Sequence, residues 1–256
     1  VIIKDTTGLS SYGTDVLENY PAVYDWLKSK KFTSDRIIEE YIQGIHAGTE
    51  IYAIPKKNGF KYKIQPPLIF SVNKYGITSP KQSIKTGPLK KTGYKINSLN
   101  KMLKNLAKKA NLKSFTQIDL IFDKKKWYVI EINPRLSGMS QTYAAMENTT
   151  IYDYMAECTS LKQKRKTEKN FVLNIKLPLL EENEIKKIAQ LPYTKLIHQI
   201  KNNQAKQLRE RGYCELIITG RTKKELKNNL NHLRINFPSQ TEEVFLEKAE
   251  ELLTKI

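Results

Sequence analysis

Three oxygen-bearing side chains occur close together in one short part of this chain of 256 residues. Asp119 lies in an apolar segment, and Glu131 and Asn133 lie two residues apart in the apolar segment that follows a polar turn. Because alternate residues of a strand point to the same face, Glu131 and Asn133 share a face, and a hairpin can bring Asp119 beside them. Carboxylate and carboxamide oxygens are hard ligands that suit Mg²⁺ when it also holds phosphates. The spacing therefore predicts a divalent-cation site formed by these three residues.

Arg135 follows this group directly after Pro134, which lacks the backbone N–H needed to continue a strand ladder. The planar guanidinium group of an arginine suits a carboxylate or a phosphate. A solvent-exposed hairpin explains the two acids less well, because apolar residues flank both and an uncompensated charge in such a setting costs free energy. We therefore expect Arg135 at the mouth of the same site, with Ser137 lining it.

The elements that must position these groups form an α+β pattern. Strands are expected at 115–122 and 127–132, joined by the polar turn 123–126. Further strands are expected at 1–3, 36–42, 50–54, 60–64, 68–72, 171–177 and 212–220, and helices at about 14–30, 99–110, 140–160, 223–233 and 241–255. Asn58 and Gly59 predict a hairpin turn, and the charged stretch 162–169 predicts a linker.

Asp119, together with the run 131–135 (Glu-Ile-Asn-Pro-Arg), resembles the metal-binding signature of the ATP-grasp superfamily. Upstream segments resemble other parts of that family in the same order. Residues 1–4 resemble its strand with a phosphate-binding lysine, the Thr/Gly/Ser loop 6–13 resembles its phosphate-covering loop, and residues 37–44 resemble its adenine-binding hinge. The resemblance covers about residues 1–150 and implies the ATP-grasp fold, in which two α+β lobes grip ATP.

The resemblance also implies roles for individual residues. Lys4 and the loop residues Thr7, Ser10 and Ser11 would contact the phosphates of ATP. The hinge residues are Glu39, whose side chain would meet the adenine amino group, and Glu40, Tyr41 and Ile42 at the ring edge. Asp119, Glu131 and Asn133 would hold one or two Mg²⁺ ions, with Mn²⁺ as an alternative, and Arg135 would orient the acyl phosphate or carboxylate.

The chain departs from the family pattern at two of these positions. His46 occupies the place where the family has a ribose-binding glutamate, but a shift of four residues puts Glu50 there, and we expect Glu50 to face the ribose. The basic residue that meets the γ-phosphate is ambiguous. Lys85 is our choice, with Lys81 and Lys63 as alternatives.

Three parts of the chain are expected. Residues 1–42 form the small lobe, 43–162 the large lobe with the metal site, and 163–256 a small C-terminal α+β domain. The family's preceding α/β domain and an earlier lysine-bearing strand have no counterpart here, so we expect the small lobe to be incomplete at its N-terminus. The resemblance implies an ATP-dependent carboxylate–amine ligase that acts through an acyl phosphate. An enzyme that uses bicarbonate, in the manner of biotin carboxylase or of carbamoyl-phosphate synthesis, and a non-catalytic nucleotide- or RNA-binding module are the alternatives.

Composition limits the partners. The net charge is +18, from 44 Lys and Arg against 26 Asp and Glu, but the lysines are scattered, which favours a solvated basic surface over a nucleic-acid site. No apolar run approaches the roughly 20 residues of a membrane span. Two distant cysteines without CxxC spacing indicate a reducing cytoplasm. We expect small-molecule acid and amine substrates, with amino acids favoured, and leave a homodimer open.

Overall fold

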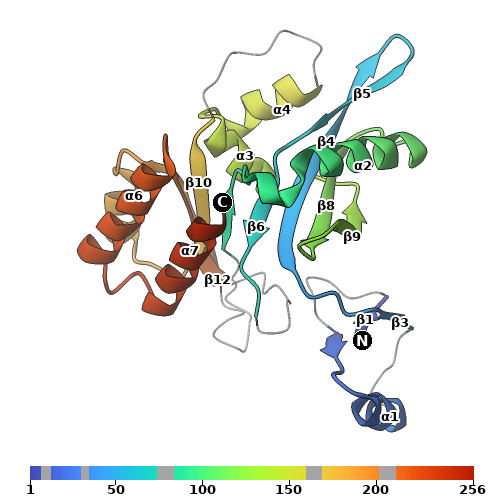
Figure 1. Cartoon of the computed structure of the whole chain (residues 1–256). Coiled ribbons are helices and arrows are strands. Elements are labelled where there is room, and N and C mark those ends of the chain that lie inside the picture. The colour runs from blue at the N-terminus through green and yellow to red at the C-terminus, as the bar shows by residue number, and fades with distance from the viewer. Residues whose placement is uncertain (7–12, 30–34, 74–83, 160–168, 202–211) are drawn as a thin grey trace.

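The computed structural model describes residues 1–6, 13–29, 35–73, 84–159, 169–201 and 212–256. Its strands form two separate sheets, one of three strands and one of nine, and every pair of neighbouring strands is antiparallel. Helices pack against the larger sheet (Figure 1). The predicted α+β class is therefore confirmed.

The smaller sheet has β1 (Ile2–Asp5) at its centre, between β2 (Thr14–Val16) and β3 (Arg36–Glu39). Helix α1 (Tyr20–Lys28) follows β2. The expected helix 14–30 is shorter than predicted, because residues 14–16 pair with β1 and the Asn19 side chain caps the helix by accepting the Ala22 N–H at 2.9 Å. Residues 7–12, which include the predicted phosphate contacts Thr7, Ser10 and Ser11, lie outside the described residues.

The larger sheet has the strand order β11-β12-β10-β7-β6-β4-β8-β9, and β5 pairs with the far end of β4. Its strands are β4 (Ile45–Lys56), β5 (Gly59–Ile64), β6 (Leu68–Phe70), β7 (Lys85–Gly87), β8 (Phe115–Phe122), β9 (Trp127–Asn133), β10 (Phe171–Leu177), β11 (Thr194–Lys201) and β12 (Gly212–Gly220). The C-terminal strands join this sheet through the pairing of β10 with β7. One sheet therefore runs through both the predicted large lobe and the predicted C-terminal domain.

Helices cover both faces of the larger sheet. They are α2 (Ile96–Lys109), which follows the short 3-10 turn η2 (Thr92–Tyr94), and α3 (Met139–Met146), α4 (Ile151–Thr159), α5 (Glu182–Ala189), α6 (Lys223–Asn236) and α7 (Glu243–Lys255). Helix α2 buries Leu99, Leu103 and Ala107, which repeat every four residues. The expected single helix at 140–160 is two helices, separated at Asn148, whose φ of 51° no helix accommodates.

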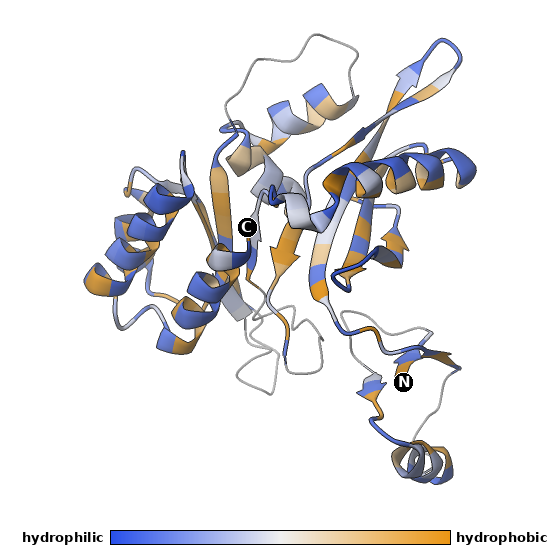
Figure 2. Cartoon of the chain, viewed as in Figure 1, coloured by the Kyte–Doolittle hydropathy of each residue, from blue (hydrophilic) through white to orange (hydrophobic). Residues whose placement is uncertain are grey.

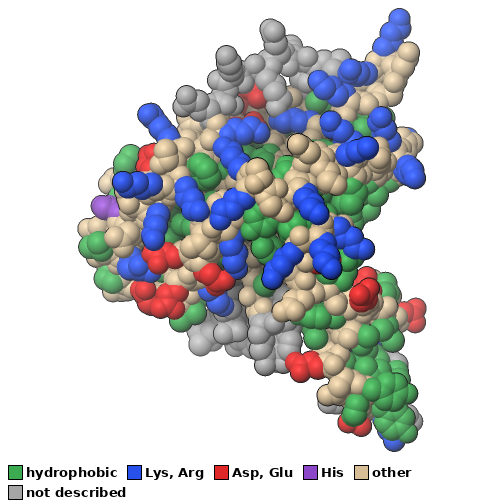
Figure 3. All heavy atoms as spheres, in the orientation of Figure 1, with side chains coloured by type: hydrophobic (Ala, Val, Ile, Leu, Met, Phe, Trp, Pro, Cys, Tyr) green, Lys and Arg blue, Asp and Glu red, His purple; other side chains and the backbone are tan. Residues whose placement is uncertain are grey.

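Apolar side chains divide into two clusters. The first contains residues of α2, α6 and α7, and the second lies under α3 and α4 and includes Tyr52, Met139 and Tyr143. Figure 2 shows apolar residues concentrated in strands such as β6 and β10, and hydrophilic ones along α2 and α6. Figure 3 shows Lys and Arg side chains scattered over the visible face, with acidic ones gathered near α7. Among the helices of the described residues, none is long and apolar enough to cross a membrane.

Candidate active site

The pairing of β8 with β9 brings the predicted metal ligands together. Asp119 lies directly opposite Glu131, and Gln117 lies opposite Asn133. Residues opposite each other in an antiparallel pair point to the same face, with Cβ atoms about 5 Å apart. The amide of Gln117 donates a hydrogen bond of 2.9 Å to Asp119 Oδ1. The two carboxylates and the carboxamide of Asn133 therefore share one face of the sheet.

Three charged groups, Glu131, Lys85 and Arg135, act on the Asp119 carboxyl. Burial raises the pKa of the Asp119 carboxyl, the hydrogen bond from Gln117 lowers it, and the Glu131 carboxylate raises it. Lys85 and Arg135 act in the opposite direction from Glu131 and lower that pKa. Arg135 is exposed and Lys85 is partly buried. Since electrostatic effects of this kind act at short range, both predicted catalytic cations lie close to the carboxylate pair.

These residues fit a divalent cation. Two carboxylates side by side raise the pKa of one of them, and a bound cation removes that repulsion. Among the described residues no group of three or more His, Cys, Asp or Glu could hold a metal ion. A divalent cation here would have the carboxamide of Asn133 as its third protein ligand, and positions would remain for phosphate oxygens and water, as Mg²⁺ prefers. Glu131 is exposed, so the apolar setting predicted for both acids applies to Asp119 only.

Lys85 lies on β7, opposite Phe70 on one side and Asn174 on the other. Its ammonium group is 5.8 Å from the centre of the Phe70 ring. Of the alternatives, Lys63 lies 3.7 Å from Glu147, away from the carboxylate pair, and Lys81 lies outside the described residues. Lys85 is therefore the lysine that the described structure brings to the predicted metal ligands.

The environment of Lys85 contains charges of both signs. Burial and then the nearby Lys176 lower the pKa of the Lys85 ammonium group. The carboxylates of Glu215, Asp119 and Glu50 raise that pKa. Lys85 thus lies between the predicted metal ligands on one side and a charged group of the C-terminal strands on the other.

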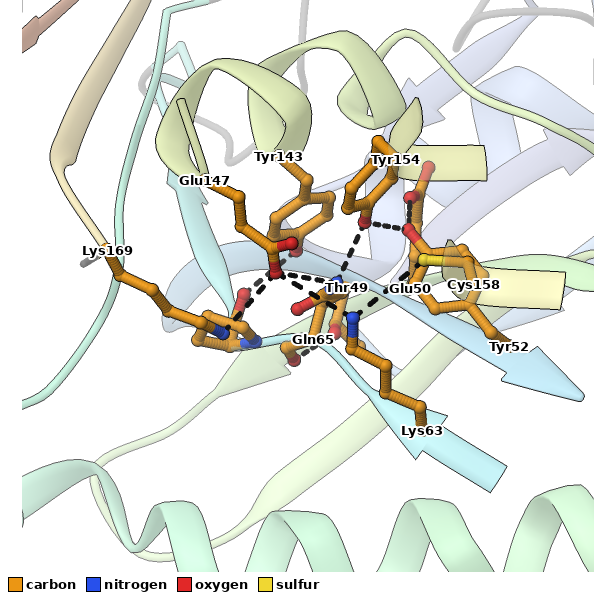
Figure 4. A network of polar contacts seen from close by, with 11 residues as sticks. Thr49, Glu50, Tyr52, Lys63, Gln65, Tyr143, Glu147, Tyr154, Cys158 and Lys169 are labelled. Atoms are coloured by element: carbon orange, nitrogen blue, oxygen red, sulfur yellow. Dashed lines mark hydrogen bonds and ion pairs between the residues drawn. The ribbon is translucent and has the colours of Figure 1, made fainter. Parts of the chain in front are cut away.

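Glu50, the expected ribose contact, is buried beneath α3. It is 1% exposed, and its carboxylate accepts a hydrogen bond from the Tyr52 hydroxyl (Figure 4). It also accepts hydrogen bonds of 2.7 Å from the hydroxyls of Ser137 and Ser140. Glu50 follows His46 by four residues on β4, which corresponds to about 13 Å along the strand. This distance separates the two candidate ribose contacts and puts Glu50 beneath α3. Its contacts indicate that it anchors the start of α3, just after Arg135.

The buried network continues beyond Glu50 (Figure 4). Tyr52 contacts the hydroxyl of Tyr154, which accepts a hydrogen bond of 2.9 Å from Gln65 Nε2. Gln65 lies 3.4 Å from Glu147, and Lys63 and Lys169 are each 3.7 Å from that carboxylate. The network fixes α3 and α4 on the sheet face beside the site.

His46, the alternative ribose contact, lies near Lys4 of the small lobe. Burial and the nearby Lys4 lower the pKa of the His46 imidazole to about 4. Lys4 on β1 is ion-paired with Glu39 on β3. Two predicted ATP contacts and His46 therefore come together near the hinge. The other predicted hinge residues connect β3 to β4, with Glu40 exposed and Tyr41 and Ile42 partly buried.

Two antiparallel sheets, with carboxylates and a lysine gathered on one face of the larger one, are the architecture of the ATP-grasp fold. The family model of the ATP-grasp domain matches residues 1–139, more than half of the 256 residues. This chain therefore belongs to the ATP-grasp family.

Solved structures support the fold assignment. N5-carboxyaminoimidazole synthetase from Staphylococcus aureus, in complex with ADP, has a TM-score of 0.65 and 14% identity over 90% of this chain and 60% of that one. L-amino acid ligase from Bacillus licheniformis has a TM-score of 0.65 and 13% identity over 91% of this chain and 62% of that one. This chain thus spans less than two thirds of either protein. No curated protein matches it by sequence.

Several residues around the site were not predicted from the sequence. Gln117 precedes Asp119 by two positions, so strand alternation already placed it on the same face. Asn174, Lys176 and Glu215 are polar residues in otherwise apolar strands, which was the available signal. Nothing in the sequence showed that their strands pair next to Lys85.

Proposed function

We propose that this protein is an ATP-dependent carboxylate–amine ligase that forms an amide or peptide-type bond. A carboxylate oxygen of the acid attacks the γ-phosphorus of ATP, and the bond from that phosphorus to ADP breaks. An amine then attacks the acyl carbon and phosphate leaves, with the amine proton lost to solvent. The observation that carries the proposal is the position of Asp119 directly opposite Glu131, with Lys85 and Arg135 acting on the same carboxyl group.

Each group has a role in this chemistry. Asp119, Glu131 and Asn133 would hold Mg²⁺ or Mn²⁺, which supplies charge neutralisation at the phosphates. Lys85 binds the transferring phosphoryl group, since it is the described lysine beside the carboxylate pair. Arg135, exposed at the end of β9, orients the carboxylate with its planar guanidinium group.

The hinge side binds the nucleotide. Glu39 and the backbone of 40–42 meet adenine, and Lys4 meets phosphate, which requires Lys4 and Glu39 to separate from their ion pair. The pair is only partly buried, so its separation costs about 1 kcal/mol or less. His46, close to Lys4, takes the place by the ribose that was expected for Glu50.

The acid is proposed to be an amino acid. The protein is proposed to work in the cytoplasm, in keeping with two cysteines that lie far apart in the sequence without CxxC spacing. Bicarbonate is the second candidate acid. The fold similarity to a carboxyaminoimidazole synthetase favours testing it beside the amino acids.

Trapping of the acyl phosphate tests this function. Purified protein is incubated with ATP, Mg²⁺ and hydroxylamine, and each proteinogenic amino acid is supplied in turn as the acid. Acid-dependent hydroxamate together with ADP supports the ligase. ADP release that depends on bicarbonate alone supports the second candidate. Absence of ADP release with every acid contradicts both.

A further inference from the structure

A pocket of about 530 Å³ lies at the end of the larger sheet where β10 begins and β12 ends. Its walls come from the end of α3, the segment around the start of β11 and the first turns of α6. None of the predicted ATP or metal contacts in the described part of the chain lines it. Helix α3 begins four residues after Arg135, and Glu147 in the pocket wall follows its last residue. The eight residues of α3 correspond to about 12 Å, so the pocket is distinct from the candidate active site.

Hydrogen bonds tie the walls of this pocket to one another. The backbone N–H of Asn170 donates to the Met146 carbonyl at 2.9 Å, and that of Thr219 donates to the Tyr193 carbonyl at 3.0 Å. Asn229 Nδ2 on α6 donates to the Thr219 carbonyl at 2.9 Å. The pocket is thus already formed before a ligand binds, which lowers the free-energy cost of binding.

The two acids in the pocket wall already have partners. Glu147 is 3% exposed, and the ammonium groups of Lys63 and Lys169 each lie 3.7 Å from its carboxylate. Glu225, in the first turn of α6, accepts the backbone N–H of Arg221 at 2.9 Å. Neither carboxylate therefore calls for a cationic ligand.

The two cations in the wall, Lys195 and Arg221, have no such partners. Both are exposed, and within the described ranges neither side chain makes a hydrogen bond or an ion pair. The charged residues of the wall, taken with the two lysines paired with Glu147, carry four positive charges and two negative ones. The start of α6 adds partial positive charge. The pocket therefore favours a ligand with two negative charges.

A phosphate monoester fits this charge. It carries about −1.5 to −2 at pH 7, whereas a monocarboxylate would leave one positive charge in excess. The planar guanidinium group of Arg221 can bind two phosphate oxygens at once. The start of a helix also suits a phosphate group.

The rest of the wall suits hydroxyl groups. Three carboxamides line it, those of Asn148, Asn170 and Asn229. Among the described residues, the side chains of Asn148 and Asn170 make no hydrogen bond, and Asn229 uses only its Nδ2. A carboxamide both donates and accepts hydrogen bonds, as the hydroxyls of a sugar do. The volume also lies within the range of about 300–1,000 Å³ that is usual for small-molecule sites.

We propose that this pocket binds a sugar phosphate, with the phosphate group at Lys195 and Arg221 and the hydroxyl groups at the three carboxamides. The pocket shares no described residue with the predicted ATP and metal site. The proposal therefore does not depend on the ligase function.

Ribose 5-phosphate is the probe, and isothermal titration calorimetry at constant ionic strength measures its binding. We expect a Kd below about 1 mM, at least about tenfold weaker binding of inorganic phosphate, and no detectable binding of ribose. Lys195→Gln combined with Arg221→Gln should raise the Kd at least about tenfold, because it removes the charge-assisted hydrogen bonds to the phosphate. Lys227→Gln combined with Lys248→Gln removes the same charge at exposed positions outside the pocket and is the matched control. All four residues are exposed, so both double variants should keep a melting temperature within a few degrees of the wild-type value.

The outcomes decide the proposal. Absence of binding to the wild-type protein, or an unchanged Kd in the variant at Lys195 and Arg221, overturns it. An equal loss of affinity in the control variant also contradicts it, since general electrostatic attraction then explains the binding. Displacement of the probe by ATP, or loss of its binding in Lys85→Met, would put the probe in the active site and reject the separate pocket.

Discussion

Asp119 on β8 and Glu131 on β9 are direct cross-strand partners, so two carboxylates face each other on one side of the larger sheet. Such a pair is unfavourable without a cation, because each negative charge opposes the ionisation of the other. Their strands hold them in place through the backbone ladder, whatever the side chains bind. Changes to either acid therefore affect the chemistry of the site more than the fold.

Glu131→Gln is expected to lower the rate of acid-dependent ADP release by at least about a hundredfold, since it removes one charge that stabilises the transition state through the cation. The melting temperature should stay within a few degrees of the wild-type value, because Glu131 is exposed. Glu247→Gln, an exposed change on α7, is the control. Activity retained in Glu131→Gln would count against the metal site.

His46 should make stability depend on pH. Its folded-state pKa of about 4 lies below the ordinary value of 6.5, so the unfolded chain binds more protons between these values. The free energy of unfolding should fall as the pH drops from 6.5 to 4, by up to about 3 kcal/mol. His46→Gln should flatten this part of the curve in urea denaturation, whereas His198→Gln should not. An unchanged slope with His46→Gln would show that His46 is not the cause.

Glu50→Gln should destabilise the protein by about 2 kcal/mol, since it weakens three hydrogen bonds to a charged group, two of them buried. Activity should fall as well, because Ser137 lies two residues from Arg135. Ser140→Ala removes one of the three hydroxyls and should have a smaller effect on both measurements. If Glu50→Gln instead lowered the affinity for ATP without loss of stability, the result would support a contact between Glu50 and the ribose.

Gly48→Ala should destabilise the protein by about 1–3 kcal/mol through overpacking. A Cβ at this position would lie 2.4 Å from Phe70 Cζ and 3.0 Å from Met139 Sδ. The Lys85 ammonium group lies 5.8 Å from the centre of the Phe70 ring, so a shift of that ring should lower turnover too. Combining it with Phe70→Leu should recover part of the stability in thermal unfolding, and no recovery would place the strain elsewhere.

The sequence predicted strands with a continuous apolar pattern better than strands without one. Strand β4 (Ile45–Lys56) was predicted only over 50–54, and β11 was not predicted. The bounds of β8, β10 and β12 agree with the predicted ranges, because each is a β-branched, apolar run that ends at turn residues. Strand β7 has only three residues, and β11 mixes exposed and half-buried residues. The sequence of neither segment therefore shows a clear strand pattern. Their existence depends on neighbours that are distant in sequence.

The same difference applies to the site. Asp119, Glu131 and Asn133 could be grouped from sequence because a short hairpin fixes their relation. Glu50 could not be placed, because its environment is made by α3, almost ninety positions later. Local spacing identifies groups on adjacent strands, whereas burial beneath a distant helix follows only from the tertiary structure.

The pairing of β10 with β7 has a consequence for any attempt to shorten the protein. Removing everything after residue 168 would turn the strand of Lys85 into an unprotected border, with free N–H and C=O groups open to pairing with other molecules. Such a fragment would tend to aggregate, and its lysine would lose the rigid backing that fixes its direction. The part of the chain that carries Lys85 and the predicted metal ligands therefore depends on the strands after residue 168 for its solubility as well as for its structure.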